Sequence, residues 1–160
     1  MTPPTPLLMA IDQGTTSSRT IIFRSDGTKV AKAQAEFPQY YPSEGWVEHN
    51  PREIWQSTLE TARTALKEAE SQGGEVISIG MTNQRETVVL WNRQTGEPLH
   101  KAIVWQDRRT AGRCAELKSQ DTEALVRERT GLVLDPYFSA TKIEWLLDHV
   151  DGARDAAYAG

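Results

Sequence analysis

The sequence predicts an α/β fold in which helices pack on a mixed sheet. Three consecutive extended segments occupy residues 7–37 and are separated by turn signals, so we expect them to pair as an antiparallel meander. An amphipathic helical segment then leads to a further apolar strand, and a helical crossover of this kind places that strand parallel to the sheet. With one more strand at residues 103–105, we expect a five-stranded core sheet.

The first three strands are bounded by recognisable turns. Leu7–Ile11 is apolar throughout and is predicted to be buried, and Arg19–Arg24 follows it after a polar loop. Asp26-Gly27 is a hairpin signal that leads into Lys29–Phe37, where apolar and polar residues alternate. Residues 1–6 are expected to form a disordered tail ahead of the first strand.

The first helix is predicted to begin at the stretch "NPRE". Asn50 can cap it, Pro51 fits its first turn, and Glu53 completes the spacing of a capping box. Apolar residues then recur at helical spacing until Gly73-Gly74 stops the pattern. These residues are Ile54, Trp55, Leu59, Ala62, Leu66 and Ala69. The apolar stretch "EVISIGMTN", residues 75–83, is then expected to be an interior strand.

The remainder of the chain is predicted to be largely helical. An extended run with a turn at Thr95-Gly96 leads to the strand at Ile103–Trp105. Helices are expected at Arg108–Lys118, Thr122–Thr130 and Thr141–Val150.

Composition excludes several classes of function. The 160 residues carry 18 basic and 22 acidic side chains without a basic stripe, so we expect neither nucleic acid nor a membrane as partner. Cys114 is the only cysteine and is expected to pack against a helix, so a reducing, cytoplasmic location is expected. The three histidines lie far apart in the sequence, which disfavours a metal site built from imidazoles. Trp46 and Trp55 are assigned to packing.

A hydroxyl-rich loop follows the first strand. The stretch "DQGTTSSR" places Asp12 beside a glycine and the hydroxyls of Thr15, Thr16 and Ser17. Backbone amides of a tight turn form an anion-binding concavity, and a nearby carboxylate can hold the accompanying cation. These are the parts of a phosphate site. A threonine-rich hairpin turn explains the same residues equally well.

A second polar stretch, "TNQRE", ends the strand at residues 75–83. Ligands of parallel α/β sheets bind outside the carboxyl ends of the strands, where both this stretch and Asp12 are expected to fall. Arg85 and Glu86 suit the adjacent hydroxyls of a small polyol, and Trp105 and Tyr137 could pack against its carbon skeleton. A surface ion pair and ordinary core aromatics are the commoner roles of such residues.

Taken together, these motifs carry a resemblance to a known family. "DQGTTSSR", "EGWVEHNP", "TNQRE", "AIVWQDRR" and "TGLVLDPYFSATKI" occur in the order found in the amino-terminal portion of glycerol kinases. Those enzymes are carbohydrate kinases with the actin-like, ribonuclease-H-like ATPase fold. The resemblance covers residues 7–160 and implies an amino-terminal carbohydrate kinase domain, incomplete and without the second domain of the family.

The resemblance implies a role for each motif residue. Asp12 would hold Mg²⁺ through water, and the phosphates of ATP would be met by Thr15, Thr16, Ser17 and Arg19. Arg85 and Glu86 would bind the hydroxyls of glycerol, Tyr137 would add a contact through its phenol, and Trp105 would line the apolar side of the site. Glycerol, ATP and ADP would be the ligands, and the whole enzyme is expected to be a homo-oligomer.

Length is the departure from the family. The aspartate that acts as catalytic base would lie beyond Gly160, so this chain alone is expected to be inactive. A kinase for another polyol or sugar stays open, although related xylulose kinases tend to carry a Gln-Met-His type sequence where this chain has Gln84-Arg85-Glu86. A non-catalytic actin-like nucleotide-binding module and a folded, inactive remnant stay open as well.

Overall fold

The chain forms two compact units in the computed structural model, which describes residues 3–159. The first unit comprises residues 1–38 and 52–84, and the second comprises residues 39–51 and 85–160. Each unit is therefore assembled from two separate stretches of the sequence.

A four-stranded sheet forms the base of the first unit. Its strands are β1 (Thr5–Gln13), β2 (Ser17–Phe23), β3 (Lys29–Glu36) and β5 (Gly74–Thr82). They lie in the order β3-β2-β1-β5, with β1 antiparallel to β2, β2 antiparallel to β3, and β1 parallel to β5. The meander and the parallel crossover are therefore confirmed, but no described residue supplies the expected fifth strand of this sheet. The expected tail is also too long, because Thr5 and Pro6 already belong to β1; residues 1 and 2 lie outside the described residues.

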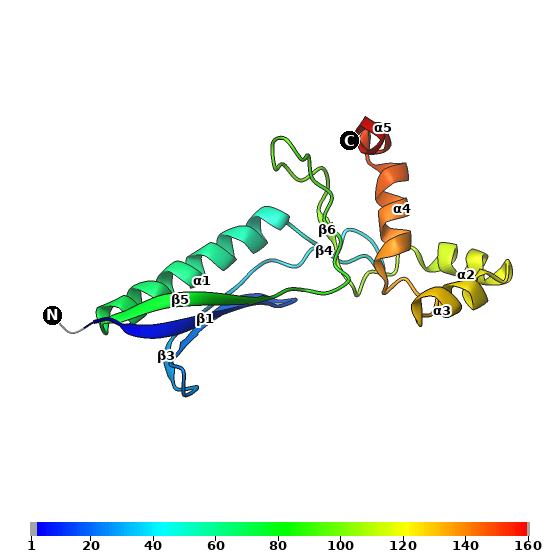
Figure 1. Cartoon of the computed structure of the whole chain (residues 1–160). Helices are drawn as coiled ribbons and strands as arrows, with labels where there is room; N and C mark the ends of the chain where they lie inside the picture. The colour runs from blue at the N-terminus through cyan, green and yellow to red at the C-terminus, as the bar shows by residue number, and fades with distance from the viewer. Residues whose placement is uncertain (1–2, 160) are drawn as a thin grey trace. The chain divides into compact units, whose positions relative to one another are not determined.

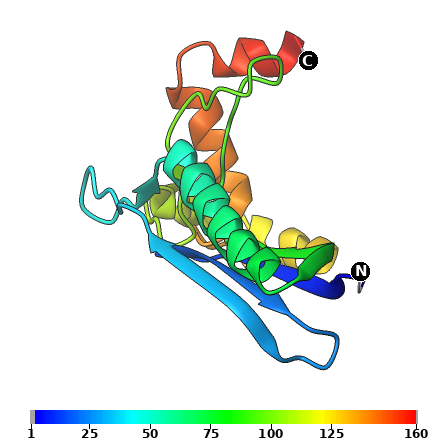
Figure 2. The same ribbon diagram turned by 90° about the vertical axis from the view of Figure 1, so that its left-hand side faces the viewer.

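Helix α1 (Pro51–Ser71) covers one face of this sheet, as Figures 1 and 2 show. The buried side chains between them come from alternate positions of β1, from β2 and from the last turns of the helix, and they include Leu7, Met9, Ile11, Ile22, Ala65 and Ala69. Alternation along a strand and a period of 3.6 along a helix place these residues on facing surfaces. The core of the first unit therefore follows directly from the two sequence patterns.

Pairs of hydroxyl groups, and not only apolar side chains, pack between α1 and β2. Ser18 Oγ lies 2.8 Å from Ser57 Oγ, and Thr20 Oγ1 lies 3.2 Å from Thr61 Oγ1. These small side chains are buried and paired, which removes the cost of burying a polar group. The face of this helix that was predicted to be buried differs from the face that is buried, which carries Ser57, Thr58, Thr61, Ala65 and Ala69. The packing role assigned to Trp55 is wrong, because this residue is 63% exposed.

Strand β5 lies at the edge of the sheet, not in its interior. Its neighbour is β1 on one side, and Ile77, Ile79 and Met81 are 60–71% exposed. The continuous apolar run was expected to indicate burial on both faces. Apolar content alone does not reveal which neighbours a strand has, and this expectation is wrong for the residues that the structure describes.

The second unit combines short strands with helices. Strands β4 (Glu48–His49) and β6 (Ala102–Ile103) pair antiparallel, so the strand expected at Ile103–Trp105 joins this small sheet. The helices are α2 (Ala111–Ser119), α3 (Thr122–Thr130), α4 (Ser139–His149) and α5 (Ala153–Ala159). The first three were predicted within a few residues, and α5 was not. None of the helices in residues 3–159 combines the length and apolar character needed to span a bilayer.

A buried cluster of charges holds the second unit together. Arg109 donates to both carboxylate oxygens of Asp107 at 3.0 and 2.9 Å and to Glu48 at 2.8 Å. The Arg109 and Asp107 side chains are fully buried. Asp107 also accepts the backbone amides of Val47 and Arg109 at 2.7 and 2.8 Å. One aspartate therefore ties the segment before α1 to the segment that leads into α2.

Two tryptophan rings cover the guanidinium of this cluster. The Arg109 carbon Cζ lies 3.8 Å from the ring centre of Trp46 and 4.5 Å from that of Trp145 on α4. The two rings meet edge to face, with centres 5.3 Å apart. The packing role assigned to Trp46 is confirmed, and the rings shield the ion pair from water, which strengthens the attraction between its charges.

We predict that Arg109→Met destabilises the second unit by about 3–5 kcal/mol, because the substitution leaves two carboxylates buried without their counter-charge. Urea unfolding followed by tryptophan fluorescence measures this. Arg154→Met is the matched control, since Arg154 and its partner Asp148 are about half exposed and such a surface pair contributes little to stability. Equal losses in the two variants would contradict the prediction.

Candidate functional site

The hydroxyl-rich loop is the tight connection between β1 and β2. Gly14 N donates to Ser17 O at 3.0 Å, which closes the turn around Thr15 and Thr16. A Cβ on Gly14 would lie 3.1 Å from Ser17 O, so a larger residue there would press on the turn. Thr16 is exposed, Thr15 and Ser17 are partly buried, and Ser17 Oγ accepts a bond from Gln34 at 3.0 Å. The loop thus presents hydroxyls from a rigid hairpin, which fits both an anion site and a plain turn.

Asp12 stands at the end of β1, directly opposite Arg19 on β2. Arg19 Nη2 donates to Asp12 Oδ2 at 2.5 Å, and both side chains are about 40% exposed. Mg²⁺ is commonly held by one or two carboxylates, water and substrate phosphates, so a single accessible aspartate beside a phosphate loop fits that ion. Among residues 3–159 no group of three or more His, Cys, Asp or Glu side chains could hold a metal ion.

Gln84, two residues beyond the end of β5, supports this loop, a role that was not predicted from the sequence. Its side chain is buried, and Nε2 donates to Gly14 O at 3.1 Å and approaches Gln13 Oε1 at 3.4 Å. Asp12 and Thr82 are partners in the parallel register, so the ends of β1 and β5 do lie together as expected. The signal that could have revealed this role was a polar residue just beyond a strand end.

The second unit brings three of the four expected polyol residues into one cluster. The rings of Trp105 and Tyr137 meet edge to face with centres 5.7 Å apart. Tyr137 is in turn linked to Glu86 through Lys142, whose ammonium donates to both of their backbone carbonyls. Arg85 precedes Glu86 and its side chain is exposed. The rings of Trp105 and Tyr137 are therefore in contact, and one ammonium joins the backbone of Tyr137 to that of Glu86.

Glu86 has an unusual backbone. Its φ of 59° lies in the left-handed region, which costs a residue with a Cβ about 1–2 kcal/mol. Its carboxylate accepts a bond from Ser139 at 2.7 Å. Strained residues persist where their surroundings over-determine the conformation, and such residues concentrate at functional sites.

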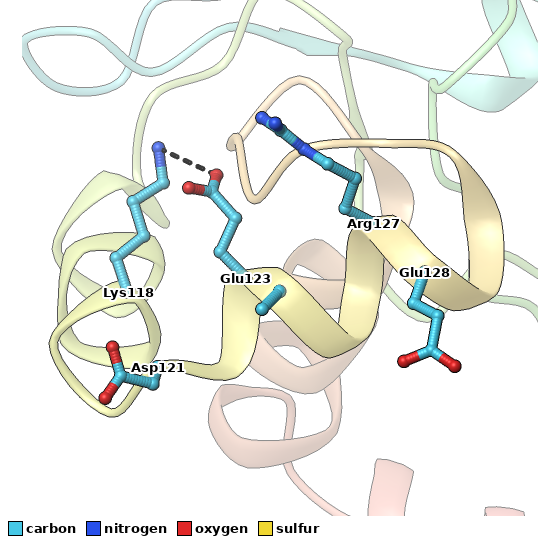
Figure 3. A pocket seen from close by; sticks show the side chains of 6 residues that line it. Lys118, Asp121, Glu123, Arg127 and Glu128 are labelled. Atoms are coloured by element: carbon cyan, nitrogen blue, oxygen red, sulfur yellow. Dashed lines mark ion pairs between the residues drawn. The ribbon is translucent and has the colours of Figure 1, made fainter.

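An open hollow lies between α2 and α3, and nothing was predicted for it from the sequence. Figure 3 shows its lining, in which Lys118 pairs with Glu123 at 3.4 Å. The other charged residues there are Asp121, Arg127 and Glu128, so positive and negative groups nearly balance. This hollow is a solvated surface between two helices and shares no residue with the Glu86 cluster.

Residues 7–159 match the family model described as "FGGY family of carbohydrate kinases, N-terminal domain". The sheet, its crossover helix and the loop after β1 are thus those of a carbohydrate kinase, and the chain belongs to this family. The expected actin-like kinase fold is confirmed by this match and by the likeness to a solved glycerol kinase structure.

The similar proteins point to one branch of the family. The chain is 60% identical over 155 residues to a glycerol kinase of Rhodospirillum centenum and 62% identical over 156 residues to one of Methylobacterium nodulans, covering 97% and 98% of this chain. It spans only 31% of the length of either relative.

Solved structures of several kinases resemble this chain. Plasmodium falciparum glycerol kinase with ADP matches with a TM-score of 0.94 and 31% identity, over 100% of this chain and 32% of that one. A xylulose kinase from Rhodospirillum rubrum matches with a TM-score of 0.84 and 27% identity, over 92% of this chain and 30% of that one. The chain therefore shares its fold with kinases that are named for different substrates.

We predict that the stability of the second unit rises with pH because of Lys142. Burial lowers the pKa of Lys142 from 10.5 to about 8, although the carboxylates of Glu86, Asp107 and Asp135 act in the opposite direction. The unfolded chain keeps the higher pKa and binds more protons between pH 8 and 10.5. Stability should therefore increase across that window, by about 3 kcal/mol in total.

Urea unfolding at about pH 7.5 and about pH 9.5 measures this effect, with Lys142→Met as the reference because it removes only the one titrating group. The unsubstituted chain should gain stability relative to the variant as the pH rises. Parallel pH profiles for the two proteins would show that Lys142 does not titrate in this range.

Proposed function

We propose that this chain is the N-terminal part of an ATP-dependent glycerol kinase. The observation that carries the proposal is the 60–62% identity to glycerol kinases along nearly the whole chain. The reaction would transfer the γ-phosphoryl group of ATP to a terminal hydroxyl of glycerol, giving ADP and glycerol 3-phosphate. The hydroxyl oxygen forms the new bond to phosphorus, the bond to the β–γ bridging oxygen breaks, and a base accepts the hydroxyl proton.

The first unit would supply the phosphate side of this reaction. Thr15, Thr16, Ser17 and the loop amides would bind phosphate oxygens, with Arg19 as a nearby positive charge. Asp12 would hold Mg²⁺ through water, and the ion would neutralise charge on the transferring phosphoryl group. Because Arg19 and Asp12 form an ion pair, phosphate binding would draw Arg19 away and free Asp12 for the hydrated ion.

The second unit would supply the glycerol side. Glu86 would accept hydrogen bonds from adjacent hydroxyls, and Arg85 would donate to them. Trp105 would cover the carbon chain, and the Tyr137 phenol would add a further polar contact. The edge-to-face packing of the two rings supports a shared apolar wall.

Kinases for another polyol or sugar are the second candidate, because a xylulose kinase shares this fold at 27% identity. The Gln84-Arg85-Glu86 sequence favours glycerol over xylulose as the substrate. A non-catalytic actin-like module is less well supported, since it gives no reason for Arg85, Glu86 and Tyr137 to occur together in one unit.

We further propose that the catalytic base lies in the sequence beyond Gly160. The carbohydrate kinase domain would extend over residues 7–160 of this chain. The whole protein would be a cytoplasmic homo-oligomer. Sedimentation velocity of the whole protein tests its assembly. A coupled assay of ADP release, with this chain beside the whole protein, tests whether residues 1–160 alone suffice. Glycerol-dependent turnover by this chain alone would contradict the position proposed for the base.

We predict that Arg85→Ala in the whole protein raises the glycerol KM about tenfold to a hundredfold and leaves the ATP KM nearly unchanged. The variant loses a charge-assisted donor, which contributes on the order of 1.5–3 kcal/mol. Steady-state kinetics with each substrate varied measures both constants. Arg93→Ala, an exposed arginine on the neighbouring loop, is the control. Unchanged glycerol kinetics in Arg85→Ala would remove Arg85 from the site.

We predict that Asp12→Asn lowers kcat and weakens its dependence on Mg²⁺, with little change in the glycerol KM. A carboxylate that orders the ion acts mainly in the transition state, so its loss appears in turnover. Asp26→Asn serves as the control, since Asp26 lies in the exposed β2–β3 turn and binds the amide of Thr28. Full activity and unaltered Mg²⁺ dependence in Asp12→Asn would leave Asp12 a strand-end residue only.

A further inference from the structure

We propose that Lys142 and Ser139 are positioning residues of the glycerol site, which hold Glu86 in one backbone and side-chain conformation. This inference rests on the proposed function above, because it assigns the two residues to the same site. Neither residue is expected to touch the substrate. They act through Glu86, and Lys142 acts through Tyr137 as well.

The buried ammonium of Lys142 joins two segments that are far apart in the sequence. The residue is fully buried, and Nζ donates to Glu86 O at 2.8 Å and to Tyr137 O at 2.6 Å. A fully buried lysine is rare unless partners compensate its lost hydration. Here the partners are the backbone carbonyls of Glu86 and Tyr137, two residues that we propose bind glycerol. The buried ammonium therefore fixes the distance between the backbones of these two residues.

Glu86 needs such a restraint more than most residues do. Its φ of 59° is unfavourable for a glutamate, and a free chain would relax to a negative φ. The bond from Lys142 to its carbonyl opposes that relaxation. The conformation of Glu86 is therefore maintained by α4 and not by its own local sequence.

Ser139 restrains the other end of the same glutamate. Its hydroxyl donates to Glu86 Oε2 at 2.7 Å, which leaves Oε1 to accept from a ligand. Ser139 and Lys142 are three residues apart in the first turn of α4, and residues at that spacing share a helix face. One helical turn thus holds both the backbone and the carboxylate of Glu86.

A first experiment tests the restraint without using activity. Hydrogen exchange of the peptide covering residues 85–88 is measured in this chain and in its Lys142→Met and Ser139→Ala variants. Lys142→Met should speed exchange of this peptide at least about tenfold, with Lys118→Met as the control because Lys118 is half exposed on α2. Unchanged exchange in a folded Lys142→Met variant would overturn the proposal.

A second experiment tests the link to glycerol in the whole protein. Ser139→Ala, the milder variant, should raise the glycerol KM about threefold to tenfold and leave the ATP KM unchanged. Ser119→Ala, an exposed serine on α2, is the control. If Ser139 acts through the Glu86 carboxylate, Ser139→Ala should cause no further loss in a Glu86→Ala background, because Glu86→Ala removes the group that Ser139 holds.

The outcomes separate this proposal from the proposed function. Additive losses, or an unchanged glycerol KM in Ser139→Ala, would show that the two residues have a structural role only. Absence of glycerol-dependent activity in the unsubstituted whole protein would instead overturn the proposed function. The hydrogen-exchange result would then still decide whether α4 holds Glu86.

Discussion

The buried pair of Arg109 and Asp107 organises the second unit. Two fully buried charges are tolerated there because Arg109 meets both carboxylate oxygens of Asp107 and because Asp107 also accepts two backbone amides. One of those amides is that of Val47, so the pair fixes the segment before α1 against the start of α2. Trp46 and Trp145 cover the guanidinium, which places α4 on the same cluster.

Helix α4 connects this ion pair to the residues that we propose bind glycerol. Trp145 lies in the helix whose first turn carries Ser139 and Lys142, and those two side chains hold Glu86. The same helix therefore contacts the buried ion pair through Trp145 and Glu86 through Ser139 and Lys142. Precise binding sites need this kind of support, because a carboxylate that samples several orientations loses selectivity for a small polyol with few contacts.

The first unit is built on a different principle. Its loop is a short hairpin between two paired strands, and its rigidity comes from the sheet and from the amide of Gln84. Small hydroxyl side chains let α1 approach β2, and each hydroxyl finds a partner there. A well-paired sheet end with hydroxyls in its turn would suit the phosphates that we propose as its ligand, because phosphates are bound largely by hydrogen bonds and charge.

Local features of the chain were enough to predict the strand meander, the crossover helix, most of the later helices and the family, because periodicity, turn residues and motif order can be read without knowing the fold. The exposure of Trp55, the edge position of β5 and the departure of residues 103–105 from the main sheet could not be predicted in this way. Those properties depend on which elements become neighbours, and the whole fold decides that. The roles of Gln84, Arg109 and Lys142 were hidden for the same reason. A buried polar residue is recognised by its partners, and their partners Gly14, Glu48 and Glu86 lie 70, 61 and 56 residues away in the sequence.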